Sequence, residues 1–358
     1  ASSSGYPLAK KGITKKIIFG SDGPYDLETI HARKLRMDVA NIISHAKNNR
    51  RCKHLFTDNL KDETRSHEKV ATGNTRLFCG APLAYTIVFR MYFGDFMRHF
   101  QKCGLRFGSA IGLNPYSQDW DELARRLISK GSVPSQHSYG AGDYKAFDAS
   151  EHPEIHWMIY DIIDSIYCIN GNAEDSRVRK ILWEEVVNSQ HVVFDVEYEW
   201  ASSLPSGHPM TSIINTIYNH IAFVYCFQRM QFDQAHLDWS FYTHIYLIAM
   251  GDDNLFACSE VVREHFGEAV VANYMKELGL TYTSDIKQES QIGLRILNDV
   301  SFLKRKFRYD MSVNRWLAPI DLDVIIETPM WYKEGPLTQE QLLQDNLRTS
   351  LCELALHG

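Results

Sequence analysis

The pattern of apolar and polar positions predicts a β-hairpin with two adjacent acids at its tip. Apolar residues fill positions 245–248 and 255–257, on either side of the turn Gly251-Asp252-Asp253. Two apolar runs joined by a short turn that contains Gly are typical of a hairpin. Carboxylates held together at its tip form a hard-oxygen site that suits Mg²⁺ or Mn²⁺. An isolated Gly-Asp-Asp turn is more often merely solvated, so the rest of the chain decides between the two interpretations.

Apolar positions at helical spacing predict that much of the remaining chain is helical. The predicted helices cover residues 26–49, 82–103, 120–130, 153–167, 212–228, 260–278 and 338–357. Extended segments are predicted around a turn at residues 72–74, in a hairpin about Asp195 and in a strand pair within residues 300–307.

A second pair of acids follows another predicted strand. Asp143 ends the run Gly140-Ala141-Gly142, and Asp148 lies five positions further on. A folded sheet would bring this strand end to the acidic hairpin, and carboxylates on two strands are what two-metal phosphoryl transfer requires. His152 and His156 have the spacing of a zinc pair, but Pro153 interrupts the helix that such a pair needs, so zinc is not predicted.

Length and composition indicate a globular protein. The 358 residues are enough for two or three subdomains, and 44% hydrophobic and 12% aromatic residues exclude a disordered chain. No apolar run approaches the roughly 20 residues of a membrane span. The seven cysteines form no C-x-x-C pair, which favours a reducing, cytosolic compartment. Without a secretory signal and with Ala as residue 1, the chain is expected to be a processed product or a fragment.

The net charge of −6 hides a strong division along the chain. Residues 1–106 hold 19 of the 38 Lys and Arg residues but only 9 of the 44 Asp and Glu residues, a balance of +10. The remainder, with 19 basic and 35 acidic residues, has a balance of −16. A basic part joined to an acidic one indicates a surface for polyanions beside a carboxylate-rich centre. Uneven surface charge without such a role is the alternative.

Two further groups of polar residues are candidates for ligand contact. Spaced cations in the segment 60–78 could grip a triphosphate, although a solvated basic hairpin would have the same pattern. These cations are Lys61, Arg65, Lys69 and Arg76. Ser206, Thr211 and Asn215 lie in a Gly/Pro loop and the first turn of the helix that follows, where a ligand can meet the helix N-terminus. Ordinary helix capping by Thr211 is the alternative.

Taken in order, these segments resemble the RNA-dependent RNA polymerases of picornavirus-like positive-strand RNA viruses. The resemblance spans nearly the whole chain, and seven motifs follow the family's order and approximate spacing. They are Ser4-Gly5-Tyr6-Pro7, Lys61-Asp62-Glu63-Thr64-Arg65, Asp143 with Asp148, Ser206-Gly207 with Asn215, Gly251-Asp252-Asp253, Lys287, and Phe302-Leu303-Lys304-Arg305.

The resemblance implies an α+β, right-hand architecture of fingers, palm and thumb, with an antiparallel palm sheet flanked by helices. The implied boundaries are 1–91 for the fingers, 92–187 for the first part of the palm, 188–204 for a fingers insertion, 205–310 for the second part of the palm and 311–358 for a partial thumb. Family members have a longer fingers segment before the Gly5-Tyr6-Pro7 loop and a longer thumb, so the chain is expected to be part of a longer polymerase. Met250, where picornaviruses often have Tyr, indicates a relative outside the picornaviruses proper, such as an insect virus.

The resemblance also assigns a role to each candidate residue. Asp143, Asp252 and Asp253 correspond to the catalytic metal ligands for Mg²⁺ or Mn²⁺, and Lys287 to the general acid that protonates pyrophosphate. Lys61, Arg65, Lys69 and Arg76 would hold the nucleotide triphosphate. Asp148, Ser206, Thr211 and Asn215 would contact the ribose 2′-hydroxyl. Gly5, Tyr6 and Pro7 would meet template RNA, and Lys304 and Arg305 would grip the primer.

The implied activity is template-directed RNA synthesis from NTPs on an RNA or protein primer. The implied partners are template RNA and other viral replication proteins, in replication complexes on membranes of the host cytoplasm. An RNA-directed DNA polymerase is the first alternative, but Asp148 and Asn215 suit a 2′-hydroxyl, which a DNA polymerase tends to exclude with a bulky side chain. A catalytically silent RNA-binding or scaffold protein is the second, and the intact acids at 143, 252 and 253 argue against it.

Overall fold

The computed structural model describes residues 3–20, 24–169, 171–234, 238–286, 293–332 and 335–358. The chain folds into two compact units. The first contains residues 1–102 and 146–218, and the second contains residues 103–145 and 219–358. Residues 146–187, which the sequence assigns to the palm, thus fold with the N-terminal part of the chain. The finer predicted boundaries of fingers, palm and thumb stay predictions.

The first unit contains a four-stranded mixed sheet in the order β2-β1-β4-β5. Its strands are β1 (Leu55–Leu60), β2 (Leu77–Gly80), β4 (Gln190–Val193) and β5 (Val196–Glu199). The hairpin predicted about Asp195 is confirmed by the antiparallel pairing of β4 with β5. The extended segments predicted around residues 72–74 are only partly right. β1 and β2 pair antiparallel, but helix α3 (His67–Ala71) occupies part of the connection.

Helices pack around this sheet and bury an aromatic core. They are α1 (Lys15–Phe19), α2 (Ile30–Lys47), α4 (Leu83–Cys103), α6 (Phe147–Ser150), α7 (Pro153–Cys168) and α8 (Ala173–Val187), with a 3₁₀ turn η1 (Ala9–Lys11). Tyr85, Phe89 and Phe93 of α4 are fully buried, and Trp183 of α8 stacks near the two phenylalanines. The aromatic residues of α4 are therefore core residues. Pro153 occupies the start of α7 as predicted.

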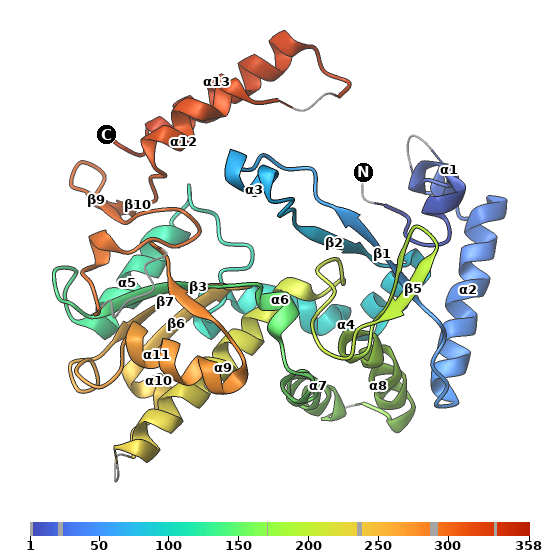
Figure 1. The fold of residues 1–358 in the computed structure, drawn as a ribbon, viewed down its shortest axis with the longest axis horizontal. Helices are drawn as coiled ribbons and strands as arrows, with labels where there is room; N and C mark the ends of the chain where they lie inside the picture. The colour runs from blue at the N-terminus through green and yellow to red at the C-terminus, as the bar shows by residue number, and fades with distance from the viewer. Residues whose placement is uncertain (1–2, 21–23, 170, 235–237, 287–292, 333–334) are drawn as a thin grey trace. The chain divides into compact units, whose positions relative to one another are not determined.

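The second unit is built on a four-stranded antiparallel sheet in the order β6-β7-β3-β8. The strands are β3 (Tyr139–Tyr144), β6 (Ile245–Met250), β7 (Asp253–Cys258) and β8 (Tyr282–Ser284). Figure 1 shows α5 (Asp119–Gly131) on one side of this sheet and α10 (Phe241–His244) and α11 (Glu268–Met275) on the other. Helix α9 (Thr211–Asp233) contributes residues 211–218 to the first unit and 219–233 to the second.

Both faces of this sheet are covered, which explains its near-continuous apolar sequence. Leu255 and Ala257 of β7 pack with α5 residues such as Leu127 in one core cluster. Phe256, which points the opposite way along β7, meets Phe223 of α9 and Phe266. Because side chains alternate along a strand, the sheet is fixed from both faces and its register is strongly specified. The mixture of helices with an antiparallel sheet confirms the predicted α+β class.

Two predicted elements of the second unit are wrong. The helix predicted over residues 260–278 is only α11, preceded by turns and followed by η3 (Lys276–Leu278), because Gly267 stands where the helix begins. The strand pair predicted within residues 300–307 is reduced to single bridges about a tight turn. The strands in this region are β9 (Arg308–Asp310) and β10 (Arg315–Leu317).

The C-terminal segment is largely helical, as predicted. It contains α12 (Leu322–Glu327) and α13 (Gln339–Leu354), and Thr338 and Gln341 form a capping box at the start of α13. Further 3₁₀ turns are η2 (Gly104–Phe107), η4 (Leu297–Asp299) and η5 (Thr328–Met330). Within the described ranges, no helix combines the length and apolar character that a membrane crossing demands.

Candidate active site

The acidic hairpin forms as the sequence predicts. β6 and β7 pair along their whole length, and the last pair is Met250 with Asp253. Gly251 has φ +70°, a left-handed conformation that favours glycine, and it makes the two-residue turn with Asp252. Asp252 therefore occupies the tip of the turn, and Asp253 is the first residue of the returning strand.

The register of the sheet brings Asp143 to the same end. Gly142 of β3 pairs with Asn254 of β7 in antiparallel register. The next position on each strand places Asp143 opposite Asp253, which corresponds to a Cβ separation of roughly 5 Å. All three carboxylate side chains, including that of Asp252, are only partly buried. The structure thus gathers Asp143, Asp252 and Asp253 at one accessible edge of the second unit.

Two buried side-chain amides donate hydrogen bonds to the backbone of the acidic turn. Asn219 of α9 donates from Nδ2 to the backbone oxygens of Gly251 at 3.1 Å and Asp252 at 3.3 Å. Asn254, fully buried in β7, donates to the Asp252 oxygen at 3.3 Å and accepts from the Tyr282 hydroxyl at 2.9 Å. Sequence reasoning missed these residues. The signal was their position, because Asn254 opens an apolar strand segment and Asn219 lies within a largely apolar helix.

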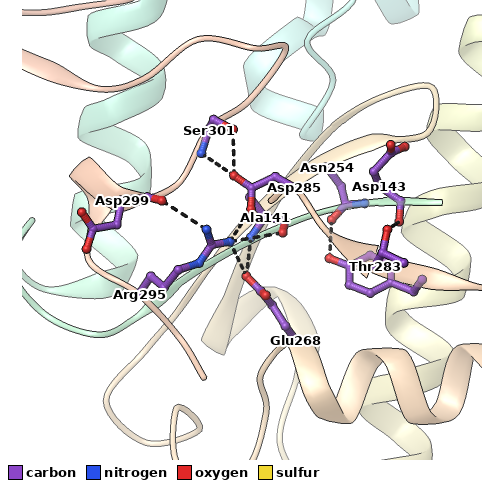
Figure 2. Close-up of polar contacts among 10 residues, drawn as sticks. Ala141, Asp143, Asn254, Glu268, Thr283, Asp285, Arg295, Asp299 and Ser301 are labelled. Carbon is purple, nitrogen blue, oxygen red and sulfur yellow. Dashed lines mark hydrogen bonds and ion pairs between the residues drawn. The ribbon is translucent and has the colours of Figure 1, made fainter. Parts of the chain in front are cut away.

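A cluster of charged side chains lies beside β3 at the point where the pairing of β3 with β8 ends, and it binds the β3 backbone there (Figure 2). Glu268 accepts from the backbone N–H of Ala141 at 3.0 Å, and the Asp285 N–H donates to the Ala141 oxygen at 3.1 Å. Arg295 lies between the two carboxylates, 2.7 Å from Glu268 and 2.6 Å from Asp285. Ser301 adds a hydroxyl bond of 2.7 Å to Asp285. Burial raises the pKa of Glu268, and the Arg295 cation opposes that shift.

In the first unit, Asp148 and Asn215 form a hydrogen-bonded pair. Asp148 lies on α6, and its Oδ1 accepts from Asn215 Nδ2 at 2.6 Å. Asn215 is 4% exposed, and its Oδ1 is buried without a hydrogen-bond partner among the described residues. The resemblance predicts that Asn215 contacts the ribose 2′-hydroxyl. In the structure one of its two amide N–H groups donates to Asp148, and its oxygen is a buried acceptor.

Ser206 belongs to the loop that precedes α9, here called the Ser206 loop (residues 204–210), and Thr211 is the first residue of α9. The Thr211 hydroxyl donates to the oxygens of Pro205 and His208, each at 3.0 Å, and so closes the loop. The exposed Ser206 donates to the Leu77 oxygen at 3.4 Å. The Leu204 N–H donates to the Asp148 oxygen at 2.8 Å. The structure therefore places Asp148, Ser206, Thr211 and Asn215 in the first unit and bonds Asp148 to Asn215 and to the Ser206 loop; their contact with the ribose stays a prediction.

The comparison with protein families decides what these two groups of residues belong to. A family model described as viral RNA-dependent RNA polymerase matches residues 1–354. The chain belongs to this family. It is 32% identical over 370 residues to the replicase polyprotein of Drosophila C virus, covering 99% of this chain and 21% of that protein. It is also 32% identical over 372 residues to the replicase polyprotein of acute bee paralysis virus, covering 100% and 19%.

A solved structure shows the fold of this polymerase family. The sicinivirus 3Dpol RNA-dependent RNA polymerase matches with a TM-score of 0.76 at 23% identity, over 100% of this chain and 73% of that chain. The predicted right-hand architecture is confirmed. The insect viruses among the relatives agree with the expectation drawn from Met250. The chain spans about a fifth of the length of these polyproteins.

The basic candidates of the polymerase gather around one acid. Lys61, Arg65 and Arg76 lie 3.5, 3.0 and 3.7 Å from Glu63. Although desolvation opposes the shift, these cations lower the pKa of Glu63. Lys69 lies exposed on α3. Three cations around a single carboxylate leave a positive excess, which is the charge that a triphosphate requires.

The remaining candidates are those predicted to contact template RNA, primer and pyrophosphate. Gly5 has φ +67°, and a Cβ there would overlap the Ala81 backbone, so the loop Gly5-Tyr6-Pro7 needs its glycine. Arg305 is 13% exposed and bound to Glu353 at 2.6 Å, so its guanidinium stabilises the second unit. Lys304 is exposed at the turn between Phe302 and Arg305 and has a positive φ. Lys287 lies outside the described residues.

A buried cluster in the first unit was not predicted. Asp58, Cys79 and His191 form the one Asp, Glu, His and Cys group in the described chain whose ligand atoms all lie within 4.8 Å. His191 Nδ1 is 2.9 Å from Asp58, its Nε2 is 2.8 Å from the Ser189 hydroxyl, and Tyr198 also donates to Asp58. These hydrogen bonds satisfy the buried carboxylate and lower its pKa against the effect of burial. The cluster therefore has a structural role in the sheet.

Proposed function

We propose that this chain catalyses template-directed RNA synthesis, the transfer of nucleotides from NTPs to the 3′ end of an RNA or protein primer, in replication of a viral RNA genome. The observation that carries the proposal is the sheet register that sets Asp143 opposite Asp253, next to the Asp252 turn. A catalytically silent protein of this fold would not need three carboxylates at one accessible sheet edge, because clustered like charges repel each other.

The carboxylates fit divalent cations. Asp143, Asp252 and Asp253 offer only hard oxygen donors, which is the donor set of Mg²⁺ and Mn²⁺ and not of zinc. Bound ions of this kind lower the pKa of an attacking hydroxyl and neutralise the charge on the leaving pyrophosphate. The protein's own contribution is to hold the carboxylates in register. Asn219 and Asn254 do this by fixing the backbone of the turn.

Sugar recognition is assigned to the Asp148–Asn215 pair. Asn215 Oδ1 is a buried acceptor without a partner in the described part of the chain, and a ribose 2′-hydroxyl is a donor that would satisfy it. Asp148 fixes the orientation of the amide through the 2.6 Å bond from Nδ2. A deoxynucleotide would leave this acceptor unpaired, which favours an RNA polymerase over a DNA polymerase.

The other assignments follow from family membership. Lys61, Arg65, Lys69 and Arg76 hold the triphosphate, and Lys287 donates a proton to pyrophosphate. The loop Gly5-Tyr6-Pro7 meets the template, and Lys304 contacts the primer. The partners are template RNA and other viral replication proteins, in complexes on membranes of the host cytoplasm.

The decisive experiment is extension of one primer–template pair by the full polymerase at fixed Mg²⁺, with NTPs or dNTPs supplied separately. RNA synthesis from NTPs supports the proposal. A preference for dNTPs would establish the DNA polymerase alternative, and template binding without any extension would establish the silent scaffold. RNA affinity should also fall steeply with salt, because the contacts are phosphate contacts of the basic N-terminal part.

A further inference from the structure

The Ser206 loop is anchored by a buried hydrogen-bond chain that nucleotide chemistry alone does not explain. His208 is 4% exposed and Tyr85 is fully buried. The Met210 N–H donates to His208 Nδ1 at 3.2 Å, and His208 Nε2 lies 2.8 Å from the Tyr85 hydroxyl oxygen. The Tyr85 hydroxyl donates in turn to the backbone oxygen of Leu182 at 3.1 Å. The chain thus runs from the loop through α4 to α8.

The donor and the acceptor of each hydrogen bond from Met210 to Leu182 can be assigned. A backbone N–H can only donate, so Nδ1 of His208 must accept and the proton of the neutral ring lies on Nε2. Nε2–H then donates to the Tyr85 oxygen, whose own proton goes to Leu182. Burial lowers the pKa of His208 to about 3, so the ring stays neutral. The edge of the ring also packs on Phe89, with centroids 4.4 Å apart.

A second contact holds the other side of the loop. A Cβ atom at Gly207 would overlap the backbone carbonyl of Cys79 in β2, so glycine is required for this close approach. Ser206 is bonded to Leu77 of the same strand, and Leu204 is bonded to the backbone of Asp148. The loop is therefore clamped between β2 on one side and Tyr85 on the other. The backbone bond from Leu204 links the loop directly to Asp148.

We propose that Tyr85 and His208 are positioning residues for sugar recognition. They hold the Ser206 loop against β2 and so fix Ser206 and the backbone of Asp148, whose side chain orients the amide of Asn215. Neither residue touches the nucleotide. This role rests on the proposed polymerase function, and it makes sugar selectivity depend on a tyrosine hydroxyl in the core.

The chain offers a matched control for the hydroxyl of Tyr85. Tyr160 is also buried, and its hydroxyl donates to the Ser176 oxygen of the same helix, α8, at 3.2 Å. Tyr85→Phe and Tyr160→Phe each remove one hydroxyl bonded to a carbonyl of α8. Only Tyr85→Phe leaves the Nε2–H of His208 without its acceptor.

The test measures kcat/KM for an NTP and the matching dNTP, the thermal unfolding midpoint, and hydrogen exchange of residues 204–210 in the full polymerase. Tyr85→Phe should narrow the NTP:dNTP ratio about 3- to 10-fold, as expected for one lost hydrogen bond, and accelerate exchange in the loop. Tyr160→Phe should lower the unfolding midpoint comparably and change neither the ratio nor the exchange. His208→Asn keeps an acceptor near Met210 and should act like Tyr85→Phe, with a double mutant that is less than additive.

The two proposals fail in different ways. If wild-type polymerase prefers NTPs and Tyr85→Phe matches Tyr160→Phe in ratio and loop exchange, the positioning role is wrong and the polymerase function stands. If the wild type incorporates no NTPs, the proposed function is wrong. Even in that case, hydrogen exchange of residues 204–210 tests the anchor by itself. If Tyr85→Phe leaves this exchange unchanged, Tyr85 does not hold the Ser206 loop.

Discussion

The carboxylates that we propose as metal ligands and the residues that we propose as sugar contacts are positioned by different physical means. Asp143, Asp252 and Asp253 lie at the end of an antiparallel sheet whose two faces are packed with apolar side chains. The Ser206 loop and the Asp148–Asn215 pair lie on irregular backbone that buried polar groups hold in place. Strand register positions the first group, and individual hydrogen bonds position the second.

This difference predicts different sensitivity to mutation. A sheet buried on both faces tolerates the loss of one hydrogen bond, because neighbouring ladder bonds and packing preserve the register. A clamped loop has few alternative supports, so one lost bond changes its conformation. Mutations around the metal carboxylates should therefore affect chemistry or global stability, whereas mutations around the Ser206 loop should affect selectivity.

The largest effect is expected from the metal carboxylates themselves. Asp252→Asn removes a charged oxygen donor from the turn and should lower nucleotide incorporation by several orders of magnitude. Template binding should persist, since it depends on phosphate contacts of the basic N-terminal part. Single-nucleotide extension and RNA binding measured on the same preparation check both statements, with Asp299→Asn as a control. Near-normal turnover of Asp252→Asn would show that Asp252 is not a metal ligand.

The next largest effect concerns the ion pairs of Arg295 with Glu268 and Asp285 beside β3, here called the Arg295 clamp. Arg295→Met leaves the buried carboxylates of Glu268 and Asp285 without a cation, which should cost about 3–5 kcal/mol of unfolding free energy. The folded-state pKa of Glu268 is already raised by burial, so the carboxyl group favours folding when it is protonated. The loss caused by Arg295→Met should therefore grow as pH rises from acid to neutral.

Urea unfolding across this pH range measures the effect. Arg98→Met is the control, because Arg98 pairs with Asp95 on the surface, where both side chains are at least 70% exposed. Arg98→Met should change the unfolding free energy little. Equal losses for the two variants would mean that the Arg295 clamp does not support β3.

Sequence patterns predicted the acidic hairpin better than the Asp148–Asn215 pair, and the reason is physical. The acidic hairpin follows from apolar runs and a Gly turn, which are local signals. The Asp148–Asn215 pair came from the family resemblance, since no periodicity links residues 67 positions apart. Asn219, Tyr85 and His208 were missed because the hydrogen-bond partners of a buried polar residue are not visible in the sequence. The strands predicted within 300–307 failed because the positive φ angles of Leu303 and Lys304 end the pairing there.

A smaller effect is expected from the sugar contact. Asn215→Ala removes the acceptor oxygen and should slow NTP incorporation more than dNTP incorporation, narrowing the kcat/KM ratio about 10-fold. Asp148→Ala should act in the same direction by freeing the amide to rotate. The exposed Asn48 supplies the control, and Asn48→Ala should leave the ratio unchanged. An unchanged ratio in both site variants would remove the pair from sugar recognition and revive the DNA polymerase alternative.

The smallest effect is a pH dependence of stability that comes from buried histidines of the first unit. Burial lowers the pKa of His54 and His156 to about 4 and that of His208 to about 3. Unfolding exposes them with a pKa near 6.5, so the unfolded chain binds more protons below this value. Stability contributed by these neutral rings is present above pH 6.5 and lost as pH falls below it.

Between pH 7.5 and 5.5 each such histidine should lower the unfolding free energy by about 1.4 kcal/mol. His208→Asn removes one of them, so its loss over this interval should be smaller than that of the wild type by about that amount. His67→Asn, at an exposed position on α3, should retain the full wild-type loss. Urea unfolding at the two pH values provides the comparison. If His208→Asn and the wild type lose the same free energy, His208 is not held neutral in the folded protein, and the proton order from Met210 to Leu182 is wrong.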